Sequence, residues 1–182
     1  DKVFADSSGI YEYTVYGGEA AITGVVSKAD FSGAQEIPAV LGEYPVTAIE
    51  NSAFENCSSL VSVTIPDSVT SIGWYAFSGC DNLKDIYITD IGAWCNVDVN
   101  WYSFGSNVSI NLYINGELIT DLVIPEGVTK INPYVFRNFN ISNITIPSTV
   151  EKIDGSAFGG SLKCIDVDEK NAVYTSEDGV LY

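Results

Sequence analysis

The sequence contains no histidine and no methionine, and only 8 of its 182 residues are lysine or arginine. The missing histidine removes the usual general base of serine and cysteine nucleophiles. The sequence also has no run of about 18 apolar residues, and its first residues lack the apolar region of an export signal. These absences argue against most hydrolases. They also predict that this segment neither spans a membrane nor carries an uncleaved export signal.

Negative charge dominates the composition, with 24 acidic residues and a formal net charge of −16. Such a surface repels phosphate backbones and anionic lipids, which argues against binding to nucleic acid or to a membrane surface. Electrostatic attraction would instead favour basic partners or cations. The alternative interpretation is that the charge only keeps an extended surface soluble.

A unit of 21 to 23 residues repeats along most of the chain, and its most complete copy runs from Leu60 to Cys80. The residues 23 positions before Val69, Ile72, Phe77 and Cys80 are Val46, Ile49, Phe54 and Cys57. Later in the chain, Ile124-Pro125 recurs as Ile146-Pro147. A fixed period in this range is typical of a solenoid, in which each unit buries its apolar face only against its neighbours.

Each unit is expected to hold a short strand, a second extended piece and a tight helical turn. In the complete copy, Val63 and Ile65 alternate inward on the strand. Pro66 ends this strand because it has no N–H to donate. Residues Tyr75–Phe77 are predicted to form the helical turn, with Phe77 filling the interior. A buried side chain of that size contributes about 1.5–3 kcal/mol, so one phenylalanine anchors each unit.

The N-terminal region departs from the period. Residues 1–34 contain two alternating segments on either side of Gly17-Gly18, which predicts a β-hairpin that caps the end of the stack. The solenoid is expected over residues 35–182. We therefore predict two regions, a cap and a repeat array.

Two further segments interrupt or end the array. An irregular insertion is expected at about 89–118, where Asn115-Gly116 between alternating segments predicts a second hairpin. A last hairpin is expected to turn at Glu177–Gly179. Since that hairpin offers no polar cap, we expect the native chain to continue beyond residue 182. The alternative is that Val180–Tyr182 pairs back as an edge.

The four cysteines are predicted to be thiols with a structural role. Cys57 and Cys80 share a repeat position and would lie about 5 Å apart on neighbouring units, within Cα range of a disulfide. Stacked side chains point the same way, however, which favours small buried apolar groups. Cys95 and Cys164 have no such partner. With no C-x-x-C pair and no histidine, we expect neither zinc nor an iron–sulfur cluster.

The unit L-x-x-I-x-I-P-x-x-V-x-x-I-x-x-x-A-F-x-x-C resembles the BspA-like leucine-rich repeat, also called the treponemal type, from about residue 35 to 182. The resemblance implies a mainly β leucine-rich-repeat solenoid with short parallel strands. It also implies a secreted or surface-anchored bacterial protein, of a kind that binds host matrix or plasma proteins or joins neighbouring cells. Because the family defines no catalytic residue and no cofactor, we expect no enzyme. Val135 departs from the pattern by replacing the small alanine, which should loosen the turn at Phe136.

The outward positions of the first strands predict two columns on the solvent face. The first column is Ser62, Asp85, Asp121, Asn143 and Cys164, and the second is Thr64, Tyr87, Val123, Thr145 and Asp166. The candidates for contact with a basic or polar polypeptide are Asp85, Tyr87, Asp121, Val123 and Asp166. The alternative is a solvated face without a ligand, since small polar residues there also suit β-structure and solubility.

Aromatic rings concentrate in the non-repeating insertion, where function tends to reside. Trp94, Trp101 and Tyr102 are the candidates, because such rings anchor protein partners and stack on sugars. The alternative is that they pack as a satellite core beneath the insertion. Trp74 and Tyr75 are interpreted as packing at the rim of a turn.

Three classes of function remain open. The main hypothesis is a non-enzymatic surface or secreted protein that adheres to host or neighbouring-cell proteins through the strand face and the insertion. The second is a structural spacer that presents another module. The third is carbohydrate binding at Trp94, Trp101 and Tyr102. The acidic residues near Asp166 lack the spacing of a calcium loop, so no metal and no cofactor is expected.

Overall fold

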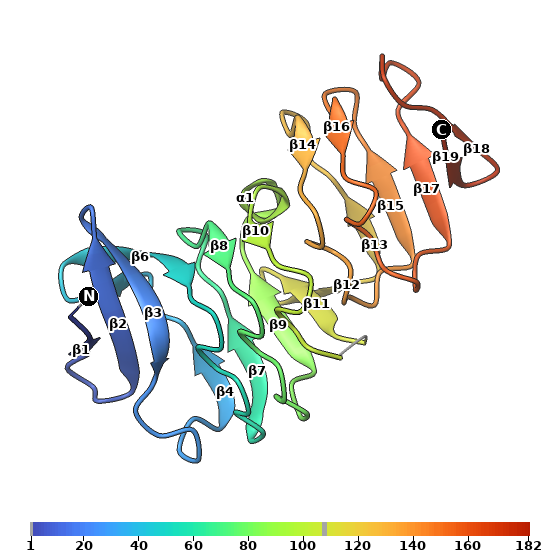
Figure 1. Cartoon of the computed structure of the whole chain (residues 1–182). Helices are drawn as coiled ribbons and strands as arrows, with labels where there is room; N and C mark the ends of the chain where they lie inside the picture. Colours follow the sequence, from blue (N-terminus) through green and yellow to red (C-terminus); the bar gives the residue numbers. More distant parts are fainter. Residues whose placement is uncertain (1, 107–108) are drawn as a thin grey trace.

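The computed structural model describes residues 2–106 and 109–182, in which short strands stack in sequence order from one end of the molecule to the other (Figure 1). Each repeat unit adds a strand to one face and a shorter extended piece to another. Because successive units are alike and follow one another directly, neighbours in the sequence are also neighbours in space. The chain is a mainly β solenoid, as the repeat predicts.

One face of the solenoid is built from the first strand of each unit. It begins with β4 (Gly33–Glu36), β7 (Leu60–Thr64), β9 (Asp85–Ile88) and β11 (Asn111–Ile114), which pair in parallel. It resumes with a separate parallel sheet of β13 (Asp121–Val123), β15 (Asn143–Ile146) and β17 (Cys164–Val167). The face is therefore interrupted between β11 and β13.

The second extended pieces are interrupted at the same level. The first group is β6 (Tyr44–Ile49), β8 (Ser71–Ile72) and β10 (Asp98–Val99) in parallel, with β5 (Val40–Leu41) antiparallel to β6. The second group is β14 (Lys130–Ile131) and β16 (Lys152–Ile153), again in parallel. Both faces break where the sequence departs from its period.

A hairpin of β2 (Tyr11–Tyr16) and β3 (Glu19–Val25) lies at the N-terminal end of the stack, with β1 (Phe4–Ala5) along its outer edge (Figure 1). Its turn uses Gly17 and Gly18 at φ 62° and 85°, a region that glycine enters without strain. Strand β3 continues the stack by pairing in parallel with β6. The hairpin is therefore joined to the solenoid through backbone hydrogen bonds.

The insertion supplies one short helix and one hairpin. Helix α1 (Ile91–Cys95) is capped at its N-terminus by Asp90. The Asp90 side chain accepts a hydrogen bond from the Ala93 N–H at 3.0 Å. Strand β12 (Glu117–Ile119) runs antiparallel to β11, with Asn115 and Gly116 at φ 51° and 83°. These two residues form the turn, so the hairpin predicted from Asn115-Gly116 is confirmed.

A row of stacked phenylalanine rings runs through a core that is otherwise built mainly from aliphatic side chains. Phe31, Phe54, Phe77 and Phe104 stack in succession with ring centroids 5.0, 5.0 and 5.3 Å apart. Beyond the insertion the row changes. Phe104 meets the tilted ring of Phe139 at 6.3 Å, and a new stack joins Phe136 to Phe158 at 6.2 Å.

The turn that carries the phenylalanine differs from the sequence prediction. Residues 74–79 form hydrogen-bonded turns rather than a helical turn, and Tyr75 has a left-handed φ of 58°. The physical reason is that backbone groups here bond to the next unit. For example, the Phe77 N–H donates to the Ser103 carbonyl at 2.6 Å.

All four cysteines lie in the described part of the chain, and all are thiols, as predicted. The Cys80 thiol donates to the Phe54 carbonyl at 3.1 Å. Its contact with Cys57, together with burial, raises the pKa of Cys80. Burial also raises the pKa of Cys95 to about 12. Both of these side chains therefore stay protonated at neutral pH and act as packing groups.

The chain ends in the third predicted hairpin. Strands β18 (Ser176–Glu177) and β19 (Val180–Leu181) are antiparallel, with Asp178 and Gly179 in the turn. Within residues 2–106 and 109–182, no helix is long and apolar enough to cross a membrane.

Candidate binding surfaces

The predicted columns exist within each sheet but do not continue across the insertion. The backbone register places Asn111 beside Asp85 and Tyr113 beside Tyr87, where the repeat pattern predicts Asp121 and Val123 of β13. The prediction was wrong at this step because β11 belongs to the insertion, in which the repeat period is lost. On the β11 side, the neighbours of Asp85 and Tyr87 are therefore residues that the sequence pattern did not identify.

The remaining column candidates lie on the second sheet. Asp121 is beside Asn143, whose side-chain amide donates to its carboxylate. Val123 and Asp166 flank Thr145. Asp121, Val123 and Asp166 are exposed, but they belong to a different surface from Asp85 and Tyr87.

A pair of stacked tyrosines stands out on the first sheet. The ring centroids of Tyr87 and Tyr113 are 4.6 Å apart, with an angle of 17° between the ring planes. Beside them, Asp85 Oδ1 accepts a hydrogen bond from Asn111 Nδ2 at 2.9 Å. Partial desolvation, with Asp85 and Tyr113 nearby, raises the pKa of Tyr87. The phenol of Tyr87 is therefore protonated and able to donate at neutral pH.

Tyr87 of the stacked pair borders a shallow depression of about 330 Å³. Its lining is Ala34, Gln35, Glu36, Ser62, Thr64 and Tyr87. Glu36 brings a second carboxylate to this surface, so Asp85 and Glu36 both favour a positively charged ligand. We call Glu36, Thr64, Asp85, Tyr87 and Tyr113 the strand face.

The three aromatic candidates of the insertion differ in how far their side chains are buried. Trp94 is only 3% exposed, and its Nε1–H donates to the Val135 carbonyl at 2.8 Å. It packs against Phe139 at 6.1 Å, so the alternative of a satellite core is correct for Trp94. Trp101 and Tyr102, by contrast, are 51% and 43% exposed.

These two exposed rings belong to a longer row. Trp74 contacts Tyr75 at 6.4 Å, Tyr75 contacts Tyr102 at 5.7 Å, Tyr102 contacts Trp101 at 5.8 Å, and Trp101 contacts Tyr134 at 6.4 Å. Trp74 and Tyr75 are exposed, whereas the sequence analysis interpreted them as packing at the rim. We call Trp74, Tyr75, Trp101, Tyr102 and Tyr134 the aromatic ridge.

The repeat itself generates this ridge. Tyr75, Tyr102 and Tyr134 each stand two residues before the buried phenylalanine of their unit, so they project at the same place on successive units. Tyr134 was missed because the small alanine that marks this turn is replaced by Val135. Aligning the units on their phenylalanines alone would have revealed it.

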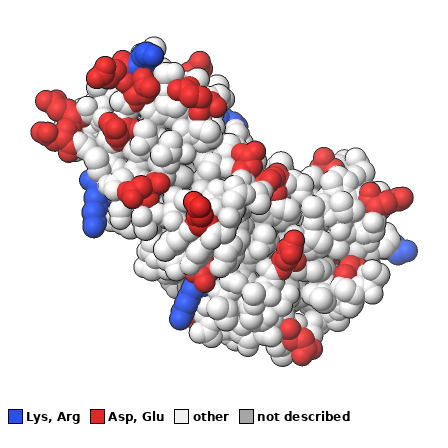
Figure 2. All heavy atoms as spheres, turned by 180° about the vertical axis from the view of Figure 1, so that it is seen from behind, with Lys and Arg blue, Asp and Glu red and all other residues white. Residues whose placement is uncertain are grey.

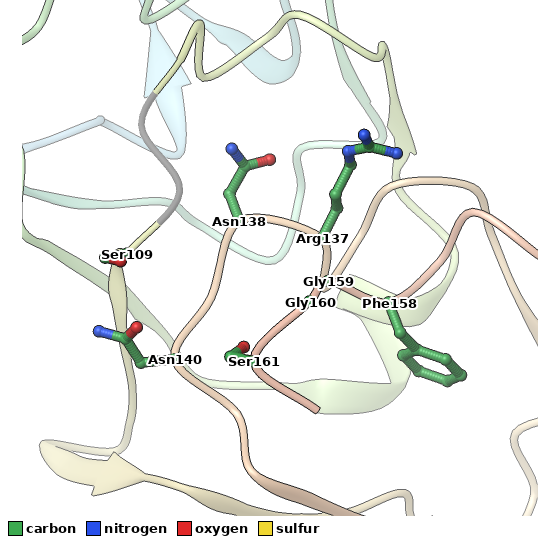
Figure 3. A pocket seen from close by; sticks show the side chains of 8 residues that line it. All are labelled: Ser109, Arg137, Asn138, Asn140, Phe158, Gly159, Gly160 and Ser161. Carbon is green, nitrogen blue, oxygen red and sulfur yellow. The ribbon is translucent and has the colours of Figure 1, made fainter. Parts of the chain in front are cut away.

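Arg137 connects the ridge to a hollow. Its guanidinium lies over the ring of Trp101 at 5.5 Å and over that of Tyr134 at 5.7 Å. The hollow has a volume of about 550 Å³ (Figure 3). Its described lining is Ser109, Arg137, Asn138, Asn140, Phe158, Gly159, Gly160 and Ser161. Apart from Arg137 and Phe158, this lining consists of neutral amides, hydroxyls and backbone.

On one face of the molecule, charge is spread out rather than gathered at one place. Figure 2 shows acidic side chains scattered over both halves of one face, with only a few basic groups among them. The chain has 8 basic residues against 24 acidic ones. A cation that lies beside exposed aromatic rings, as Arg137 does, is therefore a distinctive local feature.

Comparison with protein families identifies the type of repeat. A model described as BspA type leucine rich repeat region matches residues 25–96 and 106–182, in six copies. The chain belongs to this family. The BspA-type repeat accounts for the buried consensus positions, and it leaves the strand face and the aromatic ridge outside its packing role.

Solved structures similar to this BspA-type chain include two bacterial proteins. A leucine rich cell surface protein from Faecalibacterium prausnitzii aligns with all of the chain at 25% identity, with a TM-score of 0.55, over 58% of its own length. The pneumococcal vaccine antigen PcpA aligns with all of the chain at 20% identity, with a TM-score of 0.50, over 53% of its own length. The chain thus spans little more than half the length of either protein. Comparison with curated proteins finds no match.

Proposed function

We propose that this chain is a non-enzymatic binding segment of a secreted or cell-surface bacterial protein, and that its strand face holds a basic polypeptide from a host matrix or a neighbouring cell. The observation that carries the proposal is the stacked pair of Tyr87 and Tyr113. Asp85 lies two residues before Tyr87 on β9, and Glu36 lies on β4 in the same row across the sheet. The family match supports a repeat protein that works by binding, and the structure from F. prausnitzii is described as a cell surface protein.

Tyrosine suits this role because it offers a large, rigid contact area together with a polar tip. Residues of this kind often carry most of the energy of a protein interface. Glu36 and Asp85 would attract lysine or arginine, and the net charge of −16 would speed the approach of a basic partner. This electrostatic part of the interaction should weaken as salt is added.

The test is binding of the 182-residue chain to immobilised matrix proteins and to a lysine- and arginine-rich peptide. We expect Tyr87→Ala and Tyr113→Ala each to weaken binding by about tenfold or more. Tyr16→Ala is the matched control, because Tyr16 is 88% exposed on the N-terminal hairpin, outside the strand face. Asp121→Lys, on the second sheet, should act only through long-range charge and cost less.

Two outcomes would count against the proposal. If Tyr113→Ala and Tyr87→Ala bind as well as the unaltered chain, then the strand face is not the contact surface. If no surface change on either sheet or on the aromatic ridge affects any binding, the structural spacer becomes the better explanation.

A further inference from the structure

We propose that the aromatic ridge and the hollow beside Arg137 form a second binding site, for an oligosaccharide whose sugar rings carry carboxylates. This site is separate from the strand face and does not depend on the function proposed for it. Three features carry the inference: exposed aromatic side chains in a row, an arginine over two of the rings, and a neighbouring surface of neutral amides and hydroxyls.

The exposed rings match the apolar face of a sugar. Trp74, Tyr75, Trp101 and Tyr102 are each between 43% and 51% exposed, so large parts of their surfaces face water. An aromatic ring has a negative face, and the C–H bonds on one side of a pyranose are weakly positive. Neighbouring rings along the ridge therefore offer stacking positions to successive sugars of a short chain.

Arg137 selects for acid groups on those sugars. Its guanidinium lies over Trp101 and Tyr134, and none of the described residues accepts a hydrogen bond from its N–H groups. Among the described residues, no carboxylate lies in ion-pair contact with it. The fork of N–H donors matches a carboxylate in a bidentate manner. In a chain of net charge −16, this cation gives the ridge a local preference for an anion.

The hollow supplies partners for hydroxyl groups. Asn140 Nδ2 donates to Asn111 Oδ1 at 3.0 Å, and Ser161 Oγ donates to the Phe139 carbonyl at 2.7 Å, so both side chains are held in place by the fold. Gly159 lets the two lining segments meet, since a Cβ on this residue would lie 2.0 Å from the Arg137 carbonyl oxygen. A neutral polar hollow next to aromatic rings suits a ligand with one apolar face and a hydroxylated edge.

A protein partner fits the ridge less well. The strongest contacts of protein interfaces lie in well-packed, desolvated pockets whose surroundings exclude water. The hollow beside the ridge is instead lined mainly by asparagine, serine and glycine. The negative charges elsewhere on the surface do not cancel the preference of the ridge for an acidic sugar. The reason is that charges beyond about 8 Å are largely screened at physiological ionic strength.

The experiment compares trigalacturonate with its methyl ester by calorimetric titration of the 182-residue chain. The ester keeps the sugar rings and removes only the charge. We expect the acid to bind about tenfold more tightly than the ester, as one charge-assisted hydrogen-bonded pair would give. Arg137→Gln should reduce acid binding to the level of the ester, and Trp101→Ala should weaken both sugars. Tyr16→Ala, outside the ridge, should change neither.

Several results would overturn the proposal. They are equal binding of acid and ester, acid binding that survives Arg137→Gln, and failure of the unaltered chain to bind either sugar. Sugar binding lost in Tyr113→Ala but kept in Trp101→Ala would move the sugar to the strand face and also refute the ridge. Arg137 is an exposed side chain, so Arg137→Gln should fold normally, and its thermal unfolding would show this if Trp101→Ala were unstable.

Discussion

At the scale of single residues, Tyr11 shows how the N-terminal hairpin is attached to the solenoid. Its phenol is buried and donates to the Glu36 carbonyl at 2.8 Å. Burial, followed by the carboxylates of Asp6 and Glu36, raises the pKa of Tyr11 to about 12. The folded chain therefore holds this proton more tightly than the unfolded chain does.

This difference makes the contribution of Tyr11 depend on pH. At neutral pH we expect Tyr11→Phe to lower the free energy of unfolding by about 1 kcal/mol, the typical value of one hydrogen bond. The unfolded chain loses the phenol proton near the ordinary pKa of 10.0, so wild-type stability falls as pH rises from there towards about 12. The phenylalanine variant has no phenol at this position, so this loss of stability does not occur in it. Urea unfolding should show that the difference in free energy of unfolding between the two chains narrows as pH rises from 10.0 towards about 12. A difference that does not depend on pH would contradict the raised pKa of Tyr11.

At the scale of elements, several hydrogen bonds fix helix α1 to the second half of the molecule. Trp94 reaches from α1 to the Val135 carbonyl, 41 residues later, with its ring buried against Phe139. A second contact supports the joint, because Asn132 Nδ2 donates to the Asn96 carbonyl at 2.9 Å. The insertion therefore joins the two halves of the stack.

Replacing Trp94 with phenylalanine tests this joint. The variant keeps an aromatic ring but removes the donor to a buried carbonyl, which costs about 1–3 kcal/mol of the free energy of unfolding. Trp101→Phe is the matched control, since Trp101 is 51% exposed, and surface changes of this kind usually stay within about 0.5 kcal/mol. The measurement is urea unfolding followed by circular dichroism. Equal losses in the two variants would show that the buried bond does not stabilise the joint.

The sequence was sufficient for elements that obey a local rule. The period identified inward residues such as Val63 and Phe77, and the Asn115-Gly116 turn identified the hairpin of the insertion. It failed where the partner is distant in the chain. Nothing near Trp94 reveals the carbonyl that its indole meets, and nothing near Tyr113 reveals its stacking on Tyr87. Both of these contacts depend on how the insertion is placed in the stack.

The candidate surfaces were predicted less completely for the same reason. The sequence supplied Tyr87 and Trp101, but each of them acts together with residues outside its own unit. Tyr113 completes the strand face, and Tyr134 with Arg137 completes the aromatic ridge. A repeat pattern describes what successive units share, whereas these partners come from the insertion or from units that depart from the consensus.

At the scale of the whole molecule, the insertion divides a continuous stack into two. The phenylalanine row from Phe31 to Phe104 is closely stacked, and the pair of Phe136 and Phe158 forms a second stack. The parallel sheets on both faces of the solenoid are interrupted at the same point along the stack. In a solenoid each unit is stabilised mainly by its neighbours, so stability is a sum of local terms and the halves can open separately.

Hydrogen exchange on paired variants tests this division. Phe136→Ala and Phe54→Ala each remove a fully buried ring, a change worth about 3–5 kcal/mol. We expect Phe136→Ala to speed amide exchange in β14–β17 by about a hundredfold or more, and to change β6–β9 only a few-fold. We expect Phe54→Ala to speed amide exchange strongly in β6–β9 and to change β14–β17 only a few-fold. If either variant sped exchange equally in both halves, the insertion would transmit stability across the break, and the chain would unfold as one cooperative unit.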